Sequence, residues 1–186
     1  MFGTLQHIPS LSKNLRTVVT AVDLAIKANP EVDFGAIPKG VFFMHGHPKE
    51  IVAVLQGYTD SPEHKDKKYP LIALLRDVPE TIGQGNCGLS SESKNRIVIC
   101  TLTDPEFRAD QREAASFDKV LIPVFEEFVN QLGLSSAFGC PTVDELNILK
   151  WDRYYWGSQV MDSNTLNDYI DAIDIERIML KMANSA

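Results

Sequence analysis

One long amphipathic segment constrains the fold of this 186-residue chain more than any other feature. Between residues 110 and 132, large apolar side chains recur at three- and four-residue steps, which is the spacing of one helix face packed on a core. Gly133 supplies a signal for the end of this helix. Pro123 lies inside it and predicts a kink or a division into two helices. The apolar stripe consists of Phe117, Leu121, Val124, Phe125, Phe128 and Leu132.

A second amphipathic helix is predicted near the N-terminus. Ser10 or Ser12 can cap a helix that runs to about Asn29, where Pro30 ends it. Its apolar stripe consists of Leu11, Leu15, Val18, Val22, Ala25 and Ile26.

The segment that starts at Pro48 has two alternative interpretations. A proline suits the first turn of a helix, which would run from Pro48 to about Leu55. The valine and isoleucine content of residues 51–55 also fits a strand. The sequence leaves both alternatives open.

Short apolar and β-branched runs predict the strands. The run at 69–75 is continuously apolar, which is typical of a strand buried on both faces. The glycine- and serine-rich segment 83–93 predicts a loop, so that 69–75 and 95–103 form a hairpin with an extended tip. The remaining predicted strands are residues 40–44, about 147–156 and about 172–182.

These elements show no regular βαβ alternation. They therefore predict an α+β fold with a mainly antiparallel sheet and a long hairpin, packed by the N-terminal helix and the long central helix. The length fits a single domain over residues 1–186.

Composition and charge limit the functional class. The formal net charge of −7 argues against a basic face that binds nucleic acid. The N-terminus has no signal-peptide pattern, and no apolar run approaches the ~20 residues of a membrane span. Cys87, Cys100 and Cys140 form no paired motif, which fits a reducing compartment. We expect a protein that resides in the cytoplasm when it is made.

The residues that could carry chemistry do not converge. His45 and His47 are the first candidates for a metal site, but they flank a predicted turn and have no third ligand at motif spacing. The glycines at 83–88 precede a strand rather than a helix, so they do not form a phosphate cradle. Cys100 lies within a predicted strand as a small buried side chain. We expect no enzyme activity, no metal and no cofactor.

Two segments favour an interaction surface instead. Strand alternation places Trp151, Arg153 and Tyr155 on one side of the strand that contains them. These residue types are enriched at interface hot spots. In the last strand, Asp174 and Glu176 share a face, which we expect to be solvated or to form a subunit contact.

Four features together resemble a known group of proteins. They are residues 69–75, 101–107, 117–128, and 151–157 followed by 167–173. Together they resemble small tail-region proteins from phages and prophages of gut Bacteroides-type bacteria. The order of elements is similar to that of tail terminators of long-tailed phages. The resemblance covers roughly residues 10–182, and residues 30–68 form an insertion or an elaborated loop region within it.

The resemblance implies a structural role in the virion neck. The family forms hexameric rings that terminate the tail tube and join it to the head-side connector or stopper protein. Genomic DNA would pass through an acidic channel without sequence-specific binding, and no membrane is involved. Under this interpretation the contacts come from the hairpin tip, the aromatic strand and the last strand. The candidate residues are Gln84, Asn86, Leu89, Trp151, Arg153, Tyr155, Asp174 and Glu176.

Two other functions remain as alternatives. One is another head–tail joining protein, for head completion or as a stopper, which shares small size and ring formation. The other is a small metal-dependent hydrolase that uses His45, His47 and nearby carboxylates.

Overall fold

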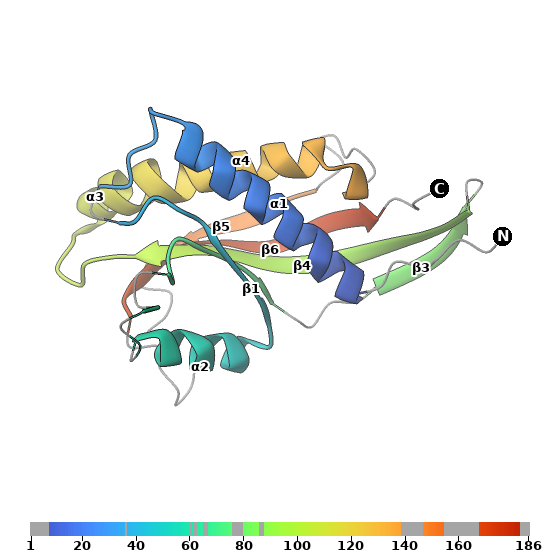
Figure 1. Cartoon of the computed structure of the whole chain (residues 1–186), viewed down its shortest axis with the longest axis horizontal. Helices are drawn as coiled ribbons and strands as arrows, with labels where there is room; N and C mark the ends of the chain where they lie inside the picture. Colours follow the sequence, from blue (N-terminus) through green and yellow to red (C-terminus); the bar gives the residue numbers. More distant parts are fainter. Residues whose placement is uncertain are drawn as a thin grey trace.

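The computed structural model describes residues 8–35, 37–59, 61, 63–64, 67–75, 80–85, 88–138, 147–154 and 168–182, with the backbone alone at 8–10, 80–92 and 181. In Figure 1, α1, α3 and α4 cover one face of a sheet and α2 lies on the other. The elements in chain order are α1 (Ile8–Ala28), β1 (Phe42–Gly46), α2 (Pro48–Thr59), β2 (Leu71–Leu75), β3 (Glu80–Gly85), β4 (Gly88–Leu102), α3 (Ala109–Arg112), the π-helical segment η1 (Glu113–Leu121), α4 (Ile122–Leu134), the 3₁₀ turn η2 (Ser136–Phe138), β5 (Leu149–Arg153) and β6 (Ile170–Met182).

Six strands form one sheet in the order β1-β2-β4-β6-β5, and β3 pairs with β4. The pair β1–β2 is parallel and all other pairs are antiparallel. The predicted α+β class with a mainly antiparallel sheet is therefore confirmed. The parallel pair arises because α2 crosses from β1 to β2, a βαβ unit that the sequence pattern did not indicate. Residues 42–59, expected within an insertion, thus belong to the sheet and to its second helical layer.

The two faces of the sheet bury separate apolar clusters. The larger one lies under α1 and α4, and it includes Leu15, Val22 and Phe128. The smaller one lies under α2, where Ile51, Val52 and Leu55 are buried. The second cluster decides the open alternative at residues 48–57 in favour of a helix. Strand β2 lies between both clusters, and Leu71 to Leu74 are buried, as the continuous apolar run predicts.

The long central helix is continuous but changes its hydrogen-bond register. The N–H of Ile122 donates to the carbonyl of Phe117, five residues earlier, and α4 begins there. Pro123 follows at once and has no N–H to donate. The disturbance predicted at Pro123 is therefore a change from π to α hydrogen bonding at the start of α4, after the nine-residue segment η1. The apolar stripe predicted for this helix packs into the larger cluster.

Strand β6 contains a bulge that changes which residues face the core. Asn95 pairs with Ile178 and Ile97 pairs with Ile175, so Glu176 and Arg177 stand opposite one residue of β4. The pairing with β5 shifts at the same place. An extra residue reverses the alternation of the side chains that follow it. Ile175 and Ile178 consequently both enter the larger cluster.

Residues 83–93, predicted as a loop, are mostly strand. β3 pairs with the first part of β4 from Glu80↔Ser93 to Gly85↔Gly88. The antiparallel pairing of β2 with β4 is confirmed, but the expected loose tip is instead a β3–β4 ribbon. Residues 91–93 of β4 also pair with β6, so only its outer part is two-stranded. In Figure 1 this ribbon extends beyond the helices. Glycine and serine lower strand propensity, but pairing with a neighbouring strand overrides that preference here.

Strand β1 ends at a glycine that the start of α2 requires. Gly46 is buried with φ +154°, and a Cβ atom there would lie 2.9 Å from Oε2 of Glu50. The same carboxylate accepts the N–H of His47 at 3.0 Å, while Nδ1 of His47 accepts the N–H of Lys49 at 3.2 Å. These contacts satisfy backbone donors at the helix start, as in a capping box.

We expect Gly46→Ala to lower the free energy of unfolding by about 1–2 kcal/mol, because alanine is strained at this φ and displaces the Glu50 cap. The matched control is Gly57→Ala in α2, where nothing lies within 4 Å of the added methyl group. That change should stabilise the protein by about 0.5–1 kcal/mol through helix propensity. Urea unfolding of both variants checks the prediction, and equal effects of the same sign would contradict it.

Candidate interaction surface

Four of the residues predicted from sequence gather on one face of β5 and β6. Trp151 pairs with Asp174 and Arg153 pairs with Ala172, so Trp151, Arg153 and Asp174 share the face on which α2 lies. The indole Nε1 of Trp151 donates to Oε2 of Glu176 at 2.7 Å. The guanidinium of Arg153 lies 5.6 Å from the Trp151 ring. The sequence predicts that each pair of residues shares a face of its own strand, and the pairing of β5 with β6 brings the two pairs together.

Asp174 is the centre of this cluster and is fully buried. Arg96 of β4 donates two hydrogen bonds to its carboxylate, from Nε to Oδ1 at 3.0 Å and from Nη2 to Oδ2 at 2.8 Å. Nε of Arg153 reaches Oδ2 at 3.3 Å. The side-chain hydrogen bond to Asp174 raises the pKa of Arg96 above its ordinary value. The expectation of a solvated Asp174 is therefore wrong, because Arg96 and Arg153 bind its carboxylate and the residue is buried. Glu176 is exposed.

The surface around Asp174 is amphipathic, and hydrogen bonds fix its side chains. The side chain of Trp151 is 49% exposed, and both arginines are about two-fifths exposed at 42%. Each is fixed by a hydrogen bond to a carboxylate, so little rotamer freedom remains to be lost on contact. Aromatic and arginine side chains presented in this way suit a protein contact. We refer to Arg96, Trp151, Arg153 and Glu176 as the tryptophan–arginine surface.

The sequence pattern missed Arg96. It places Arg96 within a predicted strand, but nothing in the pattern indicates that β6 is the neighbour of that strand. Of the other candidates, Gln84 and Leu89 are partners across the ribbon close to its turn. Asn86 and Tyr155 lie outside the described residues.

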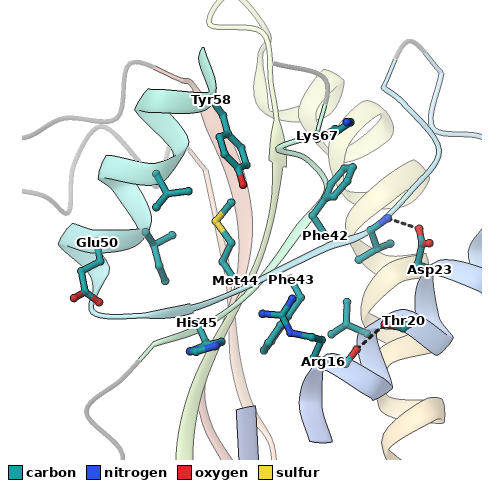
Figure 2. Close-up of a pocket in the computed structure, with 14 residues that line it drawn as sticks. Arg16, Thr20, Asp23, Phe42, Phe43, Met44, His45, Glu50, Tyr58 and Lys67 are labelled. Atoms are coloured by element: carbon teal, nitrogen blue, oxygen red, sulfur yellow. Dashed lines mark hydrogen bonds between the residues drawn. The ribbon is translucent and has the colours of Figure 1, made fainter. Parts of the chain in front are cut away.

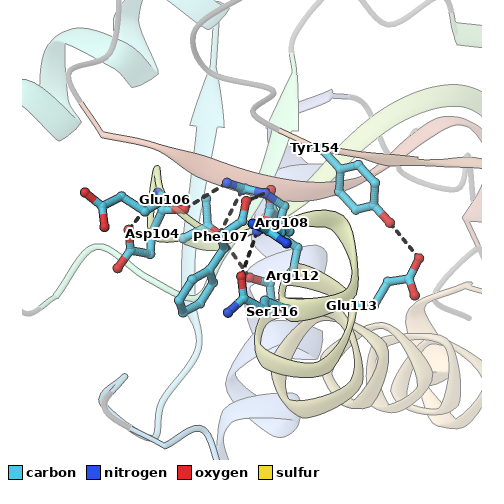
Figure 3. Close-up of polar contacts among 11 residues, drawn as sticks. Asp104, Glu106, Phe107, Arg108, Arg112, Glu113, Ser116 and Tyr154 are labelled. Atoms are coloured by element: carbon cyan, nitrogen blue, oxygen red, sulfur yellow. Dashed lines mark hydrogen bonds and ion pairs between the residues drawn. The ribbon is translucent and has the colours of Figure 1, made fainter.

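Asp171 belongs to a different site on the opposite face of the sheet, where it is the partner of Arg112. Figure 3 shows Arg112 beside Phe107 and Ser116. Arg112 is 1% exposed, and its Nη1 donates to Oδ1 of Asp171 and to Oγ1 of Thr103, both at 3.0 Å. Its remaining donors reach the carbonyls of Phe107 at 3.0 Å and Asp104 at 2.8 Å. One guanidinium therefore ties the end of β6, the 103–108 loop and the long helix together. The three carboxylates of the last strand do not form one cluster, because alternation separates Asp171 from Asp174 and Glu176.

His45 and His47 each contact a neighbouring group of β1 or α2. His47 caps α2, and the ring of His45 lies 5.9 Å from that of Phe43. Within the described ranges, no three His, Cys, Asp or Glu side chains are grouped so that they could hold a metal ion.

Cys100 is buried as predicted. Burial raises the pKa of the Cys100 thiol to about 12, and the charge of Asp168 adds to this effect. The thiol therefore stays protonated and is a poor nucleophile near neutral pH.

A groove that the sequence did not indicate runs along strand β1. It has a volume of about 530 Å³ and is lined by residues of α1, β1 and α2 together with Lys67. Figure 2 shows Arg16 and Asp23 on the α1 side and Glu50 and Tyr58 on the α2 side.

Comparison with known proteins gives no family for this chain. No protein-family model matches it, and no curated protein matches its sequence. Among the helices that the structure describes, none is long and apolar enough to cross a bilayer.

We expect Arg112→Met to lower the free energy of unfolding by about 3–5 kcal/mol, because it leaves the buried Asp171 carboxylate uncompensated. The control Lys150→Ala removes the exposed ion pair with Asp152 (2.9 Å) and should cost only about 0–1 kcal/mol. Denaturant unfolding measures both changes. The double variant Arg112→Met/Asp171→Leu should be more stable than Arg112→Met alone, and the opposite order would contradict a charge-based origin.

Cys100 predicts a stability change at alkaline pH. Below the unfolded-state pKa, about 8.5, both states hold the proton and the contribution of the thiol to stability is fully present. As pH rises toward the folded-state pKa of about 12, only the unfolded state loses the proton, so stability falls. Urea unfolding from about pH 8 to 11 should show a smaller fall in Cys100→Ala than in the unmodified chain. Parallel curves would show that the thiol does not contribute.

Proposed function

We propose that this protein is a structural subunit of a tailed-phage neck, which forms a ring that terminates the tail tube and joins it to the head-side connector. The β3–β4 ribbon is the observation that carries this proposal. It projects past the helical layers that cover the rest of the sheet (Figure 1). A projecting ribbon contributes little to the packing of its own domain, and it suits contact with a neighbouring molecule.

The resemblance to tail terminators supports the same role. It rests on the helix, sheet, hairpin and helix order, and the fold has these elements in that order. The ribbon and the tryptophan–arginine surface are different patches of one chain. A contact between two different patches is heterologous, and rotational symmetry can close it into a ring.

The charge of the chain fits a DNA channel that does not retain DNA. With a formal net charge of −7, a ring of such subunits is acidic as a whole. An acidic lining repels phosphate, so DNA would pass without sequence-specific binding.

A head-completion or stopper protein is the alternative in the same class. Both alternatives use a small subunit that forms a ring, and the projecting ribbon favours neither over the other. The metal-dependent hydrolase has less support, because His47 acts as a helix cap within the described structure.

Assembly of the purified chain tests the proposal. Native mass spectrometry and negative-stain electron microscopy should show closed rings of one copy number, expected to be six by the resemblance. Arg153→Glu should shift the population toward monomers, because it places a second carboxylate beside Asp174 and removes a contact side chain. The control Leu134→Ala changes an apolar side chain that is 70% exposed on α4, and it should leave the rings intact.

Two results would count against a ring-forming neck protein. One is a chain that remains monomeric at every concentration tested, with or without neighbouring gene products from its source genome. The other is bound metal with hydrolytic activity that is lost in His45→Ala and His47→Ala.

A further inference from the structure

The groove along β1 lies at an open edge of the sheet. β1 is the outermost strand on its side, and its inner edge pairs with β2. Helix α1 flanks it on one face of the sheet and α2 on the other (Figure 2). Its volume of about 530 Å³ falls within the range of roughly 300–1,000 Å³ found for ligand pockets. The space beside β1 is therefore bounded on three sides.

The backbone of β1 presents hydrogen-bonding groups to this space. The N–H of Phe42 donates to the carbonyl of Pro70 at 2.9 Å, so the amide groups of Phe42 and Met44 point toward β2. Amide groups alternate along a strand, so those of Val41 and Phe43 point into the groove. The N–H of Val41 is bound by Oδ1 of Asp23 at 2.8 Å. By this alternation the backbone N–H and C=O of Phe43 lie outside the pairing with β2, and no turn, cap or side-chain hydrogen bond engages them among the described residues.

The two walls of the groove differ in character. On the α2 side, Met44, Ile51 and Val54 form an apolar wall, and Val54 is 43% exposed. On the α1 side, the guanidinium of Arg16 lies 5.3 Å from the Phe43 ring. An extended chain laid along β1 would direct alternate side chains to these two walls.

The groove carries positive charge at Arg16 and Lys67 and negative charge at Glu50, which lies in the first turn of α2. Asp23 is paired with Lys27 at 2.7 Å and with the Val41 N–H, and Glu50 accepts the His47 N–H. Arg16 and Lys67 have no carboxylate within ion-pair distance among the described residues. An acidic side chain of a bound segment would therefore be complementary to the Arg16 side of the groove.

We propose that the β1 groove binds an extended segment of another protein, which adds to the sheet as a strand beside β1. The segment pairs its main chain with the outward amide groups of β1, as in recognition by strand addition. Its apolar side chains face Met44, Ile51 and Val54, and an acidic side chain pairs with Arg16. This proposal does not depend on ring formation, since it rests on β1, α1 and α2 alone.

Peptide selection tests the sequence preference. A displayed library of random peptides of about six residues, a typical strand length, is selected on the immobilised full chain. Enriched peptides should alternate apolar with other residues and should carry Asp or Glu at one fixed position. A labelled peptide from this set should bind Arg16→Glu at least about tenfold more weakly than the unmodified chain. The matched control Lys13→Glu changes an exposed residue of α1 outside the groove lining and should bind normally.

N-methylation of the selected peptide tests the strand geometry. Methyl groups on one alternate set of amides should abolish binding, while methyl groups on the other set should leave it within about threefold. Equal loss with both sets, no enrichment in the selection, or equal affinity for Arg16→Glu would overturn the proposal. Self-association of the unmodified chain that Arg16→Glu abolishes would also overturn it, because the occupant would then be a second copy.

Discussion

Strand β6 lies between β4 and β5 and carries two buried aspartates, and the fold depends on the partners that these side chains find. Asp171 faces the α1/α4 layer and Asp174 faces the α2 layer, and both are fully buried. Each receives an arginine from another element, Arg112 from α3 and Arg96 from β4. A buried carboxylate without such a partner is strongly destabilising. These pairs therefore specify which helix and which strand can lie next to β6.

The two ion pairs differ in exposure and therefore in what they stabilise. Arg112 is buried, and the hydrogen bonds described above join the 103–108 loop, the long helix and β6. Arg96 and Arg153 are partly exposed around their aspartate, so the same kind of ion pair there holds a surface in shape. That surface, the ribbon and the β1 groove are separate features on one sheet. Under the proposed function, each of these three features would be a contact region.

Much of the fold could be predicted because apolar spacing determines it. The stripes of α1 and of the long helix are buried, and the continuous run of β2 lies between two clusters. The paired strands of the ribbon could not be predicted, because glycine and serine carry no strand signal until a partner strand is placed beside them. Arg96 and Arg112 were missed for a related reason, since their partners lie 78 and 59 positions away in the chain. The groove escaped prediction because it requires knowledge of which strand forms the edge.

The sequence of β6 also carries a signal for its bulge. Ile173 and Ile175 follow a two-residue spacing, and then Ile178, Leu180 and Met182 continue it one position out of phase. A change of phase of this kind indicates an inserted residue in a strand that must keep one face buried. The bulge at Glu176 and Arg177 is that inserted residue.

The position of this bulge has a mechanical consequence. Before it, β6 pairs with the part of β4 that lies in the body of the domain, and after it with residues 91–95, which lead into the ribbon. A bulge increases local twist and bends the strand that contains it. The bulge therefore sets the direction in which the far end of β4 and its partner β3 leave the body of the domain.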